Sequence, residues 1–226
     1  MKRLNLLLIF LFALPGCKQA NKQNNTVDKQ IEFNQGLADE LKALAAIDQI
    51  AAYIPQGTFK EWSQERWNTF KDSVFTNHKT RLEEIFNQFG YPGYSLVGES
   101  GERNFWVMVQ HCDSDPDFQS RVLEKLKIEM KNKNADGRNF GLLTDRVKLN
   151  TGGKQIYGTQ VTYNSLGQAY PKNLDDSINV NKRRAEVGLA PIEIYLNEMS
   201  QMHFEMNKEL FLKRGITGPK VYKTNN

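Results

Sequence analysis

The chain has very little cysteine and histidine. It contains two cysteines and three histidines, and no CxxC or HExxH spacing joins them. Cys17 belongs to the N-terminal pattern described below, so Cys112 has no partner and an internal disulfide is excluded. We expect Cys112 to be a small buried hydrophobe rather than a reactive thiol. The histidines are scattered at positions 78, 111 and 203, so the sequence predicts neither a zinc site nor any other cofactor.

Several other signatures are also missing. No arginine-rich run is present, and the sequence shows no internal repeat and no nucleophile elbow. Gly152-Gly153-Lys154 does not complete the spacing of a Walker loop, because Gln155 follows the lysine. These absences leave nucleic acid and nucleotides without a recognisable binding element.

The N-terminus has the pattern of a bacterial lipoprotein signal. Lys2 and Arg3 precede an apolar run over residues 4–14, and Leu14-Pro15-Gly16-Cys17 follows as a lipobox. We expect residues 1–17 to act as a signal peptide and Cys17 to be lipidated, anchoring the protein to the bacterial cell envelope, at the outer membrane if one is present. A single spanning helix is the weaker alternative, because it needs roughly 20 apolar residues.

The remainder of the chain predicts one domain. Residues 18–30 are rich in Gln, Asn and Lys and are expected to form a flexible tether. Residues 31–219 are expected to fold as a single globular domain, and residues 220–226 as a frayed C-terminus. Loss of Lys2 and Arg3 with the signal leaves 28 basic against 26 acidic residues, a net charge of +2. This balance does not favour nucleic acid as a partner.

The apolar spacing predicts a mainly helical (α+β) domain with a small β-hairpin before the C-terminal helices. Asp48 lies within the apolar stripe of the first helix. Helices are expected over residues 33–54, 60–89 (one helix or a bent pair), 118–130, 177–187 and 195–210, and a short helix or turn over 140–149. Core positions of the last helix are expected to be Tyr195, Met199, Met202, Met206 and Leu210. Residues 105–109 are expected to be a buried helix or strand, and residues 156–163 and 168–170 the hairpin strands.

Polar residues follow the buried segment 105–109. His111 stands where this segment meets the next helix, as a general base or as a core histidine bonded to the backbone. The alternating acids at 113, 115 and 117 resemble the start of a calcium loop, but Phe118 occupies the position that requires glycine. We therefore expect these acids mostly to cap the helix that follows.

Two later segments also carry polar groups among apolar ones. Asp145 and Arg146 are adjacent, and Arg146 is either a grip for an anionic ligand or half of an internal ion pair that holds the hairpin to the helices. Gly158 indicates a bulge or a close approach of another backbone or of a ligand. The side chains that would project toward a pocket are Tyr157, Thr159 and Gln160, with Arg183 and Arg184 either adding positive charge or lying on an exposed helix face.

Short motifs run through the chain in a fixed order. They are Asp48-Gln49, Phe89-Gly90-Tyr91-Pro92, Leu96-Val97-Gly98, Val109-Gln110-His111, Asp115-Pro116, Phe118-Gln119, Leu143-Thr144-Asp145-Arg146-Val147, residues 155–160, Arg183-Arg184 and Val187-Gly188-Leu189. This ordered set resembles the uncharacterised bacterial family DUF6624 over residues 37–198, with Tyr91 where the family usually has Trp. The resemblance implies that the three polar segments belong to one domain type. It implies no activity.

Two functions from different classes fit these residues. In the first, His111 is a general acid–base oriented by Asp48 or Asp145, and the protein is a hydrolase or transferase acting on a small anionic or envelope-derived substrate. In the second, the same groups form a non-catalytic pocket that binds a small molecule, a glycan or a protein. A purely structural role, tying the hairpin to the helices, is the third interpretation. The sequence does not indicate the oligomeric state.

Overall fold

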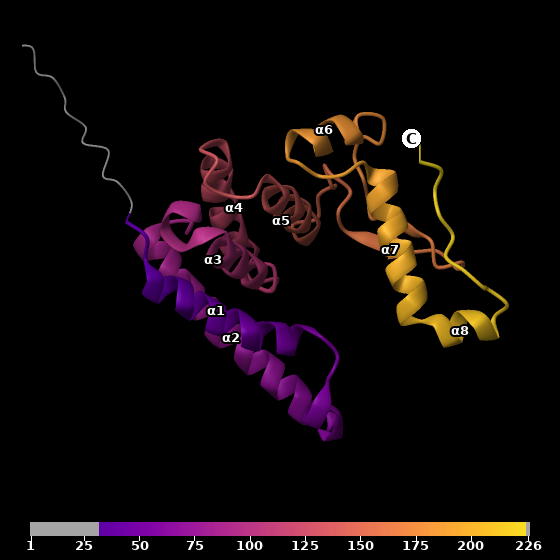
Figure 1. Ribbon diagram of the computed structural model, residues 1–226, viewed down its shortest axis with the longest axis horizontal. Coiled ribbons are helices and arrows are strands. Elements are labelled where there is room, and N and C mark those ends of the chain that lie inside the picture. Colours follow the sequence, from indigo (N-terminus) through magenta and orange to yellow (C-terminus); the bar gives the residue numbers. More distant parts are fainter. Residues whose placement is uncertain (1–31, 225–226) are drawn as a thin grey trace, which may run out of the picture. The chain divides into compact units, whose positions relative to one another are not determined.

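The protein is mainly helical, with one two-stranded antiparallel hairpin (Figure 1), as the sequence predicts. The computed structural model describes residues 32–224, so the predicted signal peptide with Cys17 and the tether over 18–30 lie outside the described residues. No helix in the described range is long and apolar enough to cross a membrane. The elements are α1 (Gln35–Ala52), a 3-10 turn (Gly57–Glu61), α2 (Gln64–Phe89), α3 (Tyr94–Val109), α4 (Pro116–Lys131), α5 (Gly137–Asn150), β1 (Val161–Tyr163), β2 (Ala169–Pro171), α6 (Val180–Glu186), α7 (Ile192–Met206) and α8 (Lys208–Lys213).

Polar side chains fix the starts of the first helices. Asn34 caps α1, Ser63 caps α2 and Asp136 caps α5, each by accepting a hydrogen bond from a backbone N–H of the first turn. Gly90 ends α2 with a φ of +73°, a conformation that a residue with a side chain adopts only at a cost. The sequence therefore determines these boundaries locally.

Helices α1 to α5 enclose the main hydrophobic core. α1 packs on α2 and α3, and α4 packs on α5. The segment 105–109, predicted as helix or strand, is the last part of α3, and its Phe105, Met108 and Val109 are buried. α3 begins well before the predicted segment, and Gly98 with a φ of +71° kinks it. Asp48 lies in the buried stripe of α1, as its spacing predicts.

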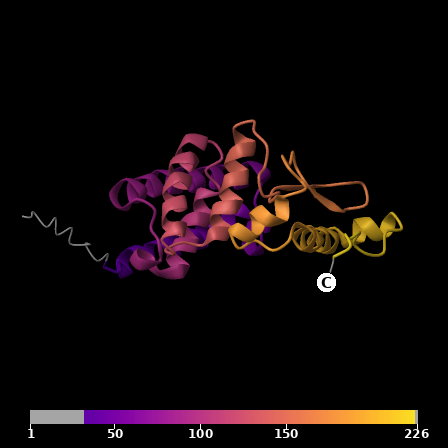
Figure 2. The ribbon, with the colours of Figure 1, turned by 90° about the horizontal axis from the view of Figure 1, so that it is seen from above.

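A second, smaller core lies between the hairpin and α7. Ala169 of β2 packs with Val180, Ile192 and Leu196, and Figure 2 shows the two strands beside α7. Tyr222 packs against this cluster and donates its hydroxyl to the carbonyl of Ala169 at 2.8 Å. Residues 220–226 were predicted to be frayed, but Tyr222 is anchored on the second core. An aromatic ring near a chain end can still pack on a core.

The hairpin is shorter than predicted. Its strands pair Val161 with Pro171 and Tyr163 with Ala169, whereas residues 156–160 form a loop that hydrogen-bonds to Asp145 instead of a neighbouring strand. Alternation of bulky and small side chains marked this segment as a strand. A buried carboxylate satisfies its backbone N–H groups in place of a strand partner.

Of the five apolar residues predicted to line the last helix, Tyr195 and Met199 pack against the second core, whereas the other three are exposed. The fully buried positions of α7 are instead Ile192, Leu196, Ser200 and Phe204, and Met206 is 75% exposed. Met202 and Leu210 are also exposed, and the predicted helix is divided into α7 and α8 at Asn207. Two adjacent stripes on this helix are apolar, and periodicity does not show which one faces the core.

Candidate functional site

Asp48 and His111 form a hydrogen-bonded pair at the end of α3. Asp48 is 1% exposed, and its Oδ2 lies 2.8 Å from Nδ1 of His111. Gln49 donates its amide to the same oxygen at 3.0 Å. His111 follows α3 in a tight turn, where its backbone N–H donates to the carbonyl of Met108. The side chain that the sequence singled out as a general base therefore has a buried carboxylate partner.

The two nitrogens of His111 are in different situations. Nδ1 faces Asp48, which in a neutral ring places the proton on this nitrogen. Nε2 has no hydrogen-bond partner among residues 32–224, and the side chain is 23% exposed. The ring packs beside Phe75, with 5.3 Å between the ring centroids. A fixed ring with a free basic nitrogen at the surface can take a proton from a bound molecule.

A second histidine, His78, lies on the other side of the same carboxylate. Its Nδ1 is 3.8 Å from Asp48 Oδ1, beyond hydrogen-bond distance, and in the described part of the chain neither atom has a partner. The sequence treated the three histidines as scattered, and this is wrong for two of them. No group of three His, Cys, Asp or Glu side chains in the described range has the geometry to hold a metal ion.

The environment of Asp48 favours its charged form. Burial is the largest influence and opposes ionisation, but the nearby rings of His111 and His78 outweigh it, so the pKa of this carboxyl lies below its usual value. The carboxylate is therefore ionised at neutral pH and stabilises a positive charge on His111 when that ring takes a second proton.

Asp145 does not reach His111, which corrects one of the two predicted pairings. Its Oδ1 accepts the N–H groups of Ile156 and Tyr157 at 2.7 and 3.0 Å. Its Oδ2 accepts the N–H and the hydroxyl of Thr159 at 2.8 and 3.0 Å. The side chain has no exposed surface, so Asp145 is fully occupied in holding the loop 156–160.

The arginines of α6 hold the same loop from its other side. Arg183 donates to the carbonyl of Ile156 and to Asp176, and the buried Arg184 donates to the carbonyls of Tyr157 and Ala190. One predicted alternative, an exposed helix face, is therefore wrong for Arg184. Both arginine side chains form hydrogen bonds within the fold.

Several polar groups of the loop itself are also hydrogen-bonded within the fold. The backbone of Gln160 exchanges two hydrogen bonds with the side chain of Gln155. Tyr157 is buried, and Thr159 is bonded to Asp145. Internal hydrogen bonds therefore account for the Thr159 hydroxyl and the Gln160 backbone, whereas the Tyr157 hydroxyl and the Gln160 side-chain amide have no hydrogen-bond partner among residues 32–224.

Arg146 contacts the turn that carries His111. It forms a two-point ion pair with Asp113, with both N···O distances 2.7 Å, and Asn150 donates to the same aspartate. Because Asp113 belongs to the turn that carries His111, the pair ties α5 to that turn and not to the hairpin. Of the alternating acids, Asp115 caps α4 and Asp113 does not.

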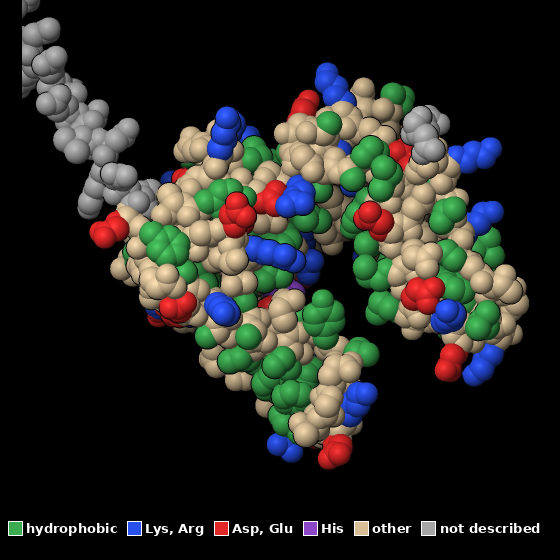
Figure 3. Space-filling model, viewed as in Figure 1, with side chains coloured by type: hydrophobic (Ala, Val, Ile, Leu, Met, Phe, Trp, Pro, Cys, Tyr) green, Lys and Arg blue, Asp and Glu red, His purple; other side chains and the backbone are tan. Residues whose placement is uncertain are grey.

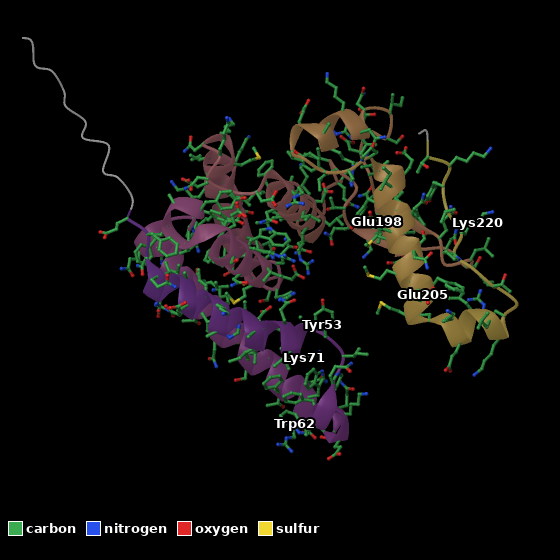
Figure 4. All side chains as sticks on the ribbon, in the orientation of Figure 1. Tyr53, Trp62, Lys71, Glu198, Glu205 and Lys220 are labelled. Atoms are coloured by element: carbon green, nitrogen blue, oxygen red, sulfur yellow. The ribbon has the colours of Figure 1, made fainter. Side chains whose placement is uncertain are left out.

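An apolar cavity of about 460 Å³ lies beside the end of α1. Ile50, Tyr53, Ile54 and Phe59 line it, together with Gln49, whose amide also binds Asp48. Hydrophobic side chains gather over this end of the α1–α2 pair (Figure 3), where Figure 4 places Tyr53. Gln49 thus connects the buried carboxylate to an apolar cavity.

The fold and the site define a mainly helical domain in which a buried aspartate holds a partly exposed histidine. The chain belongs to a family of unknown function, DUF6624, whose model matches residues 35–204. This range contains Asp48, His78 and His111. No curated protein and no solved structure matches the chain.

Proposed function

We propose that the protein is an acid–base enzyme, a hydrolase or group transferase, that acts through His111 with Asp48 as its orienting partner. The observation that carries this proposal is the 2.8 Å contact of His111 Nδ1 with a carboxylate that is 1% exposed, together with the free Nε2. An aspartate buried against histidines, with no lysine or arginine partner among the described residues, is an unusual way to stabilise a fold.

The proposed reaction follows from the two nitrogens. His111 Nε2 takes the proton of a water or hydroxyl whose oxygen attacks the electrophilic centre of the substrate, and the Asp48 carboxylate stabilises the imidazolium that results. The proton then passes from Nε2 to the leaving group as its bond breaks. His111 returns to its neutral form, and no cofactor enters these steps.

The residues around the Asp48–His111 pair limit the chemical class of the substrate. Asp113 already neutralises Arg146 by a two-point ion pair, so we place no anionic group of the substrate there. The apolar cavity beside Gln49 favours a substrate with an apolar portion. An envelope-derived molecule with such a portion fits both observations.

The proposed location is the bacterial cell envelope. The support is the sequence pattern from Lys2 to Cys17. Metabolic labelling with an alkyne-bearing fatty acid is expected to mark the full chain and to leave a Cys17→Ala variant unmarked. Equal labelling of both would exclude lipidation at Cys17.

The activity is tested with chromogenic esters, phosphoesters, amides and glycosides. We expect one class to be turned over by the full chain and the rate to fall by about 10²- to 10⁴-fold in His111→Asn, with a loss also in Asp48→Asn. His203→Asn is the matched control, because His203 stacks on Tyr163 in the second core. Retained turnover in His111→Asn, or no turnover of any class by the wild type, would favour the non-catalytic binding domain.

A further inference from the structure

A second cavity, of about 730 Å³, lies between α3 and α5. Its α3 wall carries Glu102 and Trp106, one helical turn apart, and both reach Asn139 at the start of α5. This cavity is separate from the Asp48–His111 site, because Glu102 faces α5 whereas His111 faces α1. Nothing in the proposed acid–base function uses it.

Glu102 is a buried carboxyl group without a cationic partner. It is 1% exposed, and it accepts the hydroxyl of Tyr91 at 2.5 Å and the amide of Asn139 at 3.1 and 3.2 Å. All these donors are neutral, and no lysine, arginine or histidine within residues 32–224 forms an ion pair with it. Burial raises the pKa of Glu102 above its usual value, so its negative charge is incompletely compensated in the fold.

The other charges of the cavity do not compensate Glu102. Arg138 is held by Asp136 through its Nε and Nη2, so these two residues neutralise each other. Glu99 and Arg103 are both exposed and add one charge of each sign. The lining therefore has three acids against two arginines, a net charge of −1. The uncompensated group is Glu102.

The walls around Glu102 are aromatic and aliphatic. Trp106 is fixed because its indole N–H donates to the carbonyl of Asn139 at 3.0 Å. Tyr94, Leu142 and Leu189 line the cavity with it. Aromatic faces attract cations, and aliphatic walls bind the carbon skeleton of a small ligand.

We propose that this cavity binds a small molecule that carries a protonated amine on an apolar skeleton. Its ammonium group lies at Glu102 and supplies the missing positive charge, and its skeleton lies against Trp106 and Leu142. The juxtaposition of an uncompensated buried carboxylate and a fixed indole in one cavity selects an amine over a carboxylate or a neutral alcohol.

The test compares three probes of one shape on the full chain. Phenethylamine is the cation, 2-phenylethanol is the neutral isostere and 3-phenylpropionate is the anion. The readout is the indole N–H resonance of Trp106, assigned with a Trp106→Phe variant, because this group borders the cavity. We expect a saturable shift with the amine and none with the other two probes at the same concentrations.

Two variants identify the group responsible. Glu102→Gln keeps the shape and removes the charge, and amine binding is expected to weaken by about tenfold or more. Glu99→Gln, the matched control, removes an exposed carboxylate of the same cavity and is expected to change binding little. If Glu102→Gln does not fold, the three probes on the wild type decide alone. Equal shifts with amine and alcohol, no shift with the amine, or unchanged binding in a folded Glu102→Gln would overturn the proposal.

Discussion

Replacement of Asp145 by asparagine tests whether this buried carboxylate is structural. Asp145 accepts three backbone N–H groups and one hydroxyl, all from the loop 156–159. An asparagine offers one carbonyl oxygen and places an NH₂ group where the second oxygen was. If the amide oxygen keeps the N–H groups of Ile156 and Tyr157, the NH₂ group then faces the N–H of Thr159, so a buried donor loses its acceptor.

The magnitude follows from the number of unsatisfied groups. A buried polar group without a partner costs about 1–3 kcal/mol, and here the N–H of Thr159 and the new amide are both affected. We expect a loss of about 2–4 kcal/mol in the free energy of unfolding. For a domain of this size, that corresponds to a fall of about 5–15 °C in melting temperature.

Thermal unfolding followed by circular dichroism at 222 nm measures this loss. Asp113→Asn is the matched control, since Asp113 pairs with Arg146 and its side chain is 47% exposed. A pair this exposed contributes about 1 kcal/mol or less, so the control should melt within about 4 °C of the wild type. If Asp145→Asn melts with the control, the hydrogen bonds to the loop 156–159 do not stabilise the protein as inferred.

Three further predictions concern other parts of the fold. Burial raises the pKa of the Cys112 thiol to about 12. In a Cys17→Ala variant at pH 8, we therefore expect Ellman's reagent to react with Cys112 only after urea unfolding. Rapid reaction of the folded protein would contradict this. Truncation after Lys220 removes the bonds of Tyr222 to Asn197 and Ala169 and should lower the melting temperature, whereas unchanged melting would show that this segment is not anchored. Although burial opposes its charge, contacts with histidine keep the folded-state pKa of Asp48 below 3.8, so ionised Asp48 stabilises the fold above that pH. Urea unfolding should show the stability advantage of the wild type over Asp48→Asn shrinking as the pH falls below about 4; an advantage that grows on acidification would contradict the sign.

The helices could be predicted because their signals are local. The spacing around Asp48, the capping residues and the glycine at 90 all act within one or two turns of chain. Gly158 was predicted to mark a bulge or the close approach of a backbone or ligand; it has a φ of +70°, and the group that lies close to it is the side chain of Ile192. The exposed methionines of α7 were misassigned, because the choice between two adjacent apolar stripes is made by the neighbouring elements.

The candidate site could be predicted only in part. His111 was singled out by its position after a buried segment, but the choice between Asp48 and Asp145 as its partner depends on how α1, α3 and α5 pack. His78 lies on α2 without any local feature that distinguishes it from a surface residue. Asp145 was grouped with the site because burial for structure and burial for function leave the same pattern in a sequence.

The imidazole tautomer of His111 tests the proposed Asp48–His111 site most directly, because it requires no substrate. A long-range ¹H–¹⁵N correlation spectrum of the full chain, above the pH at which the ring is charged, distinguishes the two neutral forms, and a His111→Asn variant assigns the signals. A base held by Asp48 has its proton on Nδ1 and leaves Nε2 unprotonated, and Asp48→Asn should weaken this preference. A proton on Nε2 in the wild type would contradict the proposed site, because that nitrogen could not then accept a proton.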